Sequence, residues 1–153
     1  MRLFFALALL SLGSAAFGQQ VSPIAQLCDD RPRADAIFEP WEANTRTFAN
    51  GAVRLALIDT VEPAAAWAHL LILSPPYDEL GLRQCILVNN GGMGFSAMQF
   101  EALEASYDPA RGLIFTLPAG VYLDGGPGDP VFDLEIVLNQ STGRVDARVL
   151  GQR

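Results

Sequence analysis

The sequence contains no lysine and only one histidine, His69. Without lysine there is no Walker-type phosphate loop, and a Ser-His-Asp arrangement would depend on His69 alone as its base. The nearest approach to a G-x-S-x-G nucleophile motif, residues 94–98 (GFSAM), fails at its last position. His69 lies in an apolar stretch, so we interpret it as a core or edge histidine with one hydrogen-bond partner. Together with two cysteines it also supplies too few ligands for a tetrahedral zinc site.

Three other motifs lack the context that their chemistry needs. Residues 91–94 (GGMG) have no G-x-G-x-x-G spacing and no parallel sheet to hold a phosphate. The acids of residues 124–133 (DGGPGDPVFD) do not follow the EF-hand spacing, and Asp and Gly are ordinary turn residues. Glu101 and Glu104 could be a glycosidase pair, but no aromatic sugar platform accompanies them. We therefore predict no catalytic, cofactor-binding or metal-binding residue.

Positive charge is scarce. Ten arginines oppose 17 acidic residues, which gives a formal net charge of −7. This balance argues against nucleic acid or an anionic membrane surface as a partner.

Long apolar runs are absent after the first residues of the chain. Arg2 precedes a ten-residue run, Leu3–Leu12, and residues 16–18 (AFG) form a small-x-small cleavage site before Gln19. This run is shorter than the about 20 apolar residues that span a bilayer. Neither a lipoprotein nor a twin-arginine signal fits, because Leu27 precedes Cys28 and Arg2 stands alone. We expect residues 1–18 to be a cleavable signal peptide and the mature protein to reach the periplasm or the medium, with no stable membrane anchor.

The two cysteines, Cys28 and Cys85, are widely spaced. In an oxidising compartment an isolated pair of this kind favours a structural disulfide, whereas redox chemistry prefers a C-x-x-C motif. We predict a Cys28–Cys85 disulfide.

The rest of the chain consists of short β-rich runs between turn signals. Residues 19–36 are polar and contain proline, which predicts an extended lead-in, and residues 37–153 are expected to form one β domain. Asn50-Gly51 favours a type I′ hairpin turn that pairs Phe48 with Val53. Pro75-Pro76 ends the apolar run 67–73.

Residues 94–107 are ambiguous, because good helix formers overlap an alternating pattern. We favour a strand over 103–107, preceded by at most one helical turn. Further strands follow over 113–118, 131–138 and 144–150. The fold class predicted is all-β: an antiparallel meander of seven to nine strands, forming a sandwich or a small barrel, with at most one short helix.

These features favour a non-enzymatic, exported binding or interaction module with an unknown protein or small-molecule partner. Loops on a rigid β scaffold usually make such contacts, which draws attention to residues 74–81, 89–94 and 124–130. Two alternatives remain: a lipocalin-like barrel carrying a small apolar ligand, and an inhibitor of an exported enzyme acting through residues 74–81 (SPPYDELG). A small hydrolase is disfavoured because it would depend on His69.

Overall fold

The structure is a computed structural model, and it describes residues 21–122 and 132–152. The expected signal peptide (residues 1–18) and the Gly/Pro loop 124–130 lie outside the described residues. Within the described part of the chain, no helix has the length and apolar character needed to cross a membrane.

The first sheet, sheet A, contains five antiparallel strands in the order β1-β5-β4-β3-β2. Its strands are β1 (Pro23–Leu27), β2 (Thr45–Phe48), β3 (Val53–Asp59), β4 (Ala68–Tyr77) and β5 (Arg83–Asn90). Part of the expected lead-in, residues 19–36, therefore forms an edge strand of the sheet, β1.

The second sheet, sheet B, has the order β10-β9-β8-β6, and β7 also pairs with β8. Its strands are β6 (Ala97–Met98), β7 (Glu104–Asp108), β8 (Gly112–Gly120), β9 (Phe132–Leu138) and β10 (Val145–Gln152). The helical content of the described residues is four 3-10 turns: η1 (Ala34–Ala36), η2 (Ala49–Gly51), η3 (Ala64–Ala66) and η4 (Phe100–Ala102). The predicted all-β class is confirmed.

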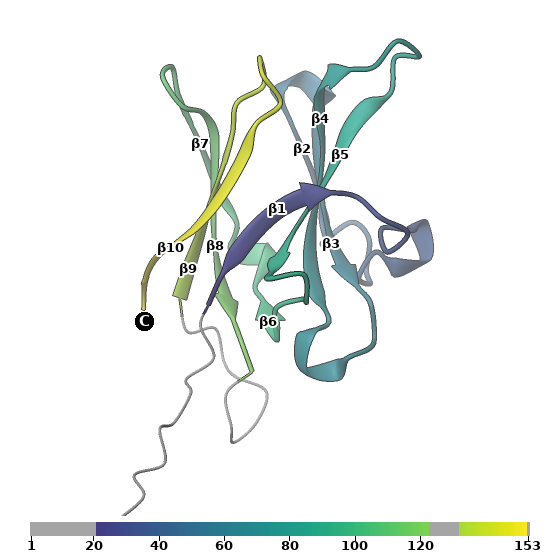
Figure 1. Cartoon of the computed structure of the whole chain (residues 1–153), viewed down its shortest axis with the longest axis vertical. Coiled ribbons are helices and arrows are strands. Elements are labelled where there is room, and N and C mark those ends of the chain that lie inside the picture. Colours follow the sequence, from purple (N-terminus) through teal and green to yellow (C-terminus); the bar gives the residue numbers. More distant parts are fainter. Residues whose placement is uncertain (1–20, 123–131, 153) are drawn as a thin grey trace, which may run out of the picture.

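The two sheets form a sandwich and not a closed barrel (Figure 1). β1 lies alongside β10 where the two sheets approach one another. Of the two architectures left open by the sequence, the small barrel is therefore not realised. The ten strands of the described residues exceed the expected seven to nine, because β1 and the two-residue β6 carry too little apolar alternation to be recognised.

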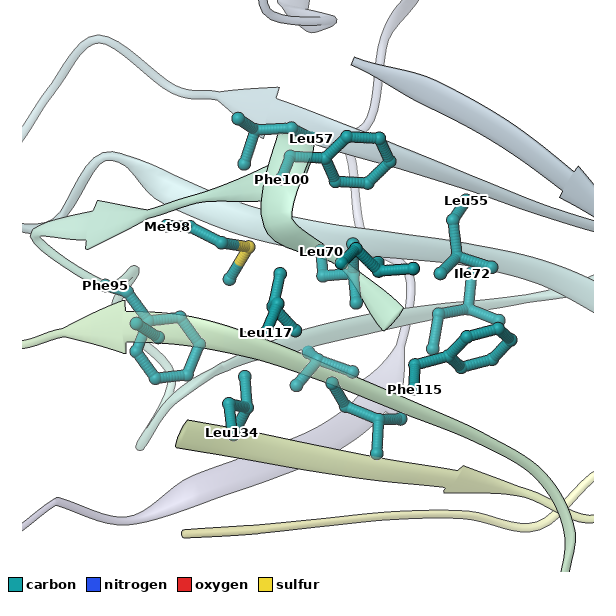
Figure 2. Close-up of a cluster of buried hydrophobic side chains, with 14 of the residues drawn as sticks. Leu55, Leu57, Leu70, Ile72, Phe95, Met98, Phe100, Phe115, Leu117 and Leu134 are labelled. Atoms are coloured by element: carbon teal, nitrogen blue, oxygen red, sulfur yellow. The ribbon is translucent and has the colours of Figure 1, made fainter. Parts of the chain in front are cut away.

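The core lies between the sheets and is built mainly from alternate residues of β3, β4, β5, β8 and β9. Figure 2 shows how side chains from both sheets interdigitate there, among them Leu55 and Ile72 of sheet A and Phe115 and Leu134 of sheet B. Four phenylalanines are at most 1% exposed: Phe95, Phe100, Phe115 and Phe132. Burying each large apolar side chain contributes roughly 1.5–3 kcal/mol. The space in which a lipocalin-like fold would hold a ligand is therefore occupied by side chains.

The Asn50-Gly51 turn has the predicted geometry. Both residues have positive φ, 54° and 85°, and the Ala52 N–H donates to the Ala49 carbonyl over 3.1 Å. These are the features of a type I′ turn. The strands that it joins pair Phe48 with Val53, so the predicted register is confirmed.

The ambiguous stretch 94–107 contains both predicted elements. The 3-10 turn η4 precedes strand β7, as expected for one helical turn before a strand. Leu103 is buried beneath this turn, but Ala105 and Tyr107 are exposed. Their alternation therefore does not mark a core face, because β7 is an edge strand.

Candidate functional site

The β4–β5 hairpin extends beyond the body of the sandwich at one end of the molecule (Figure 1). Its tip, residues 78–82, carries the second half of the segment SPPYDELG (residues 74–81) that the sequence singled out. Three features determine what this hairpin can do: an irregular base, a hydrogen-bonded tip and a set of exposed apolar side chains.

The base of the hairpin is widened by two prolines. Ser74 pairs with Gln84 and the next pair is Tyr77 with Arg83, so Pro75 and Pro76 have no partner residues on β5. Proline has no N–H to donate to a ladder, and such residues are tolerated at bulges. The sequence predicted a strand end at this point; the structure instead continues β4 through a bulge to Tyr77.

The tip is held by the carboxylate of Asp78. Its Oδ1 accepts hydrogen bonds from the backbone N–H groups of Leu80 (2.9 Å) and Leu82 (2.8 Å). The backbone of Asp78 also donates to the Leu82 carbonyl (2.9 Å) and accepts from Gly81 (3.0 Å). Aspartate commonly folds a turn in this way, since its short side chain reaches the backbone two residues on. The tip is therefore a defined turn.

Two side chains tie the hairpin to its neighbours. The Arg83 guanidinium donates to the carbonyls of Ala52 (2.9 Å) and Gly51 (3.0 Å) in the β2–β3 turn, and it lies 5.7 Å from the Tyr77 ring centre. Gln84 donates to the Gly143 carbonyl (2.6 Å) in the β9–β10 turn. The hairpin is thus anchored to turns of both sheets.

Large apolar side chains on this anchored hairpin face solvent. Tyr77 is 49% exposed, Leu80 84% and Leu82 60%. The acidic residues Asp78 and Glu79 stand between them and are also exposed. The site therefore presents apolar area that a partner could bury.

His69 lies elsewhere, on β4 opposite Ile58 of β3. It is 2% exposed, and its Nδ1 has no hydrogen-bond partner among the described residues. Burial, reinforced by the positive charge of Arg31 and opposed by Asp29, lowers the pKa of His69 to about 4. His69 is thus buried, and the single hydrogen-bond partner expected for it stays a prediction.

The other residues weighed from the sequence are dispersed. Cys28 and Cys85 form the predicted disulfide, with Cα atoms 5.3 Å apart, and so join β1 to β5. Residues 91 and 92 form a tight turn, because Asn90 and Met93 exchange backbone hydrogen bonds. Glu101 lies in η4 and Glu104 begins β7. No cluster of three His, Cys, Asp or Glu residues suited to a metal occurs in the described part of the chain.

Sequence reasoning selected the hairpin tip but missed its anchors. Arg83 and Gln84 carry no local signal of this role, because their partners Gly51 and Gly143 are distant in sequence. The local signals for the hairpin tip are Pro75-Pro76 and Asp78-Glu79.

Comparison of the chain with protein-family models, curated proteins and solved structures finds no match.

Proposed function

We propose that this chain is a non-enzymatic interaction module that binds a partner protein through the tip of the β4–β5 hairpin. The observation that carries the proposal is the exposure of Tyr77, Leu80 and Leu82 on a turn whose backbone is fixed by hydrogen bonds. An isolated exposed leucine is ordinary on a protein surface, but a cluster of large apolar side chains on a projecting element favours a contact surface.

Pre-organisation supports this proposal. Ordering a flexible loop on binding costs free energy, and a loop already held in one conformation avoids much of that cost. Asp78 fixes the tip and Arg83 fixes the base, so the exposed side chains start from a defined arrangement. Tyrosine is also enriched at interaction hot spots, because it combines a large apolar ring with a hydroxyl group.

The charge of the hairpin and of the chain indicates the chemistry of the partner. Asp78 and Glu79 immediately precede Leu80, and the chain has a formal net charge of −7. A complementary surface would offer an apolar pocket for Leu80 with basic residues around it. An inhibitor of an exported enzyme is the narrower form of the same proposal, in which that pocket belongs to an active-site cleft.

We also propose that the protein is exported, so that its partner is an exported protein. The pattern of residues 1–18 supports this, as does the Cys28–Cys85 disulfide, since disulfides persist mainly in oxidising compartments.

Replacing Leu80 with serine tests the hairpin against a matched exposed leucine. Leu27, 74% exposed on β1, provides the control variant Leu27→Ser, because both substitutions remove a solvent-facing leucine. Immobilised wild type and both variants would be incubated with exported proteins of the native host. The dissociation constant of any retained protein would then be measured by calorimetry with purified components.

We expect Leu80→Ser to weaken that complex by about 10- to 100-fold, the effect of unburying one leucine at a hot spot. Leu27→Ser should leave it unchanged, and Glu79→Arg should weaken it most at low salt. A complex that survives Leu80→Ser, or self-association of the chain as the only binding observed, would contradict the proposal.

A further inference from the structure

A second surface, on the outer face of sheet B, is rich in arginine. It is a cleft of about 360 Å³ next to the β7–β8 and β9–β10 turns. Its lining residues are Ala110, Arg111, Val137, Asn139, Arg144, Asp146 and Arg148. Three of the ten arginines of an acidic chain therefore meet in one place.

The cleft is organised by a buried acid, Glu135 of β9. Residues at alternate positions of β9 point into the core, which turns Glu135 to the outer face. Its Oε1 accepts hydrogen bonds from Arg111 Nη2 (2.5 Å) and Arg148 Nε (2.7 Å), and the residue is only 6% exposed. Burial raises the pKa of Glu135, but the hydrogen bonds from both guanidinium groups outweigh it and hold the pKa below its ordinary value. Glu135 is thus a fixed anion that positions two arginines.

One carboxylate cannot neutralise two guanidinium groups. The third arginine, Arg144, is paired with Asp146 at 2.8 Å. Within these ion pairs three guanidinium groups face two carboxylates, while Asp108, at the start of the β7–β8 turn, also acts electrostatically on Arg111. Arginine has five N–H donors, and Arg111 and Arg148 each use one on Glu135. Within the described residues the remaining donors of these two arginines have no protein acceptor.

A second surface cleft provides an internal comparison. It has a volume of about 300 Å³ and is lined by Asp30, Arg31, Arg33, Asp35, Ala36, Asp59, Thr60 and Val61. Two arginines there face three lining aspartates, and Arg31 is also paired with Asp29 at 2.6 Å, so the net charge is negative. Arg33 is paired with Asp35 two residues on, at 3.0 Å, just as Arg144 is paired with Asp146.

We propose that the cleft formed by Arg111, Arg144 and Arg148 binds a small tetrahedral oxyanion, either free phosphate or sulfate or the phosphate group of a small molecule. Guanidinium groups offer parallel N–H donors that match the oxygen atoms of such anions. Because Glu135 already holds two of the three side chains, binding requires little further ordering of them. The site is independent of the hairpin and of its proposed partner.

To test this, the full chain would be titrated with each anion at constant ionic strength. Binding would be measured by the amide chemical shifts of the protein and by calorimetry. The anions compared would be inorganic phosphate, sulfate and glycerol phosphate, with chloride as the control. If glycerol phosphate binds more tightly than inorganic phosphate, the ligand is a phosphorylated small molecule. Arg144→Gln and its control Arg33→Gln each remove an exposed arginine from an equivalent ion pair. Asp146→Asn and Asp35→Asn remove the acids of the same pairs.

We expect shifts at the amides around Arg111, Asn139 and Arg144, and weaker binding by roughly three- to tenfold in Arg144→Gln, the scale of one partly screened charge-assisted contact. Asp146→Asn should tighten binding, because it adds one net positive charge to the cleft. Neither control variant should change the affinity. Absence of saturable binding in the wild type, or equal effects of Arg144→Gln and Arg33→Gln, would overturn the proposal.

Discussion

Burial sets the behaviour of His69, the single histidine of the chain. The side chain lies against the outer face of sheet A beneath the segment that carries Asp29 and Arg31, and its pKa falls to about 4. An exposed histidine titrates near 6.5. Folding therefore requires a neutral imidazole over a pH range in which the unfolded chain would be protonated.

This difference predicts a pH-dependent stability with a defined sign. Between pH 6.5 and about 4 the unfolded state binds a proton at His69 that the folded state does not, so stability falls as the pH falls. The pKa difference corresponds to a loss of about 2 kcal/mol at pH 5 relative to neutral pH. Urea unfolding at pH 7, 6 and 5 measures it.

The variant His69→Leu isolates the contribution of this residue. Because the chain has no other histidine, the variant should show a nearly flat free energy of unfolding between pH 7 and 5. The pKa of Asp29, lowered to about 2 chiefly by its hydrogen bond from Arg31, places that carboxylate's transition below this window. A wild-type slope that persists in His69→Leu would assign the effect to carboxylates.

At the scale of elements, the sequence predicts a turn or strand well where neighbouring residues specify it, and poorly where a distant strand does. Asn50-Gly51 specified its turn and the register of β2 with β3 within ten residues, because positive φ at two adjacent positions leaves few alternatives. The strand β1 was missed, because its burial comes from pairing with β5, more than 50 residues away. The continuation of β4 past Pro75 also depends on another strand, because the pairing with β5 accommodates the two prolines as a bulge.

Two glycines in turns separate the effect of backbone conformation from that of packing. Gly51 has φ of 85° and a Cβ added there would meet nothing within 4 Å. Gly143 has φ of 75°, but a Cβ there would lie 2.4 Å from Pro76 Cδ and 2.6 Å from Gln84 Oε1. Both positions disfavour an L side chain, and only Gly143 lies tightly against the base of the hairpin.

We therefore expect Gly51→Ala to destabilise the protein by about 1 kcal/mol, the usual cost of a left-handed conformation. Gly143→Ala should cost roughly 2–4 kcal/mol, since overpacking adds 1–3 kcal/mol to that conformational term. Chemical denaturation of both variants measures the difference. Equal losses would show that the β9–β10 turn moves freely away from the hairpin and does not anchor it.

At the scale of the whole molecule, the two candidate surfaces were unequally visible in the sequence. The hairpin tip is continuous, so its prolines and acidic residues identified it. The arginine cleft combines a β7–β8 turn with outward positions of β9 and β10, and its formation depends on Glu135 standing opposite Arg148. Alternation predicts which residues of a strand face outward, but it does not give the register between strands. Arg111 and Arg148 could not be grouped without that register.

The disulfide acts on the whole chain, because it closes a loop between residues 57 positions apart. In the chain-entropy account, a loop of this length stabilises the folded state by about 4 kcal/mol, through restriction of the unfolded ensemble. The intact mass of the protein from its native host shows whether the bond is present: it should correspond to a chain that begins at Gln19 and lacks two hydrogens. A mass that includes residues 1–18, or reactive thiols, would contradict the proposed export and oxidation.

Replacing both cysteines, Cys28→Ser with Cys85→Ser, should then lower the free energy of unfolding by about 4 kcal/mol. The fold should persist, because the Cys28 N–H still donates to the Cys85 carbonyl (3.0 Å) and the β1–β5 ladder continues from there. Urea denaturation followed by circular dichroism measures both quantities, and reduced wild type is the control that should match the double variant. A loss below about 1 kcal/mol would mean that the unfolded chain already keeps these segments together, so that closing the loop restricts it little.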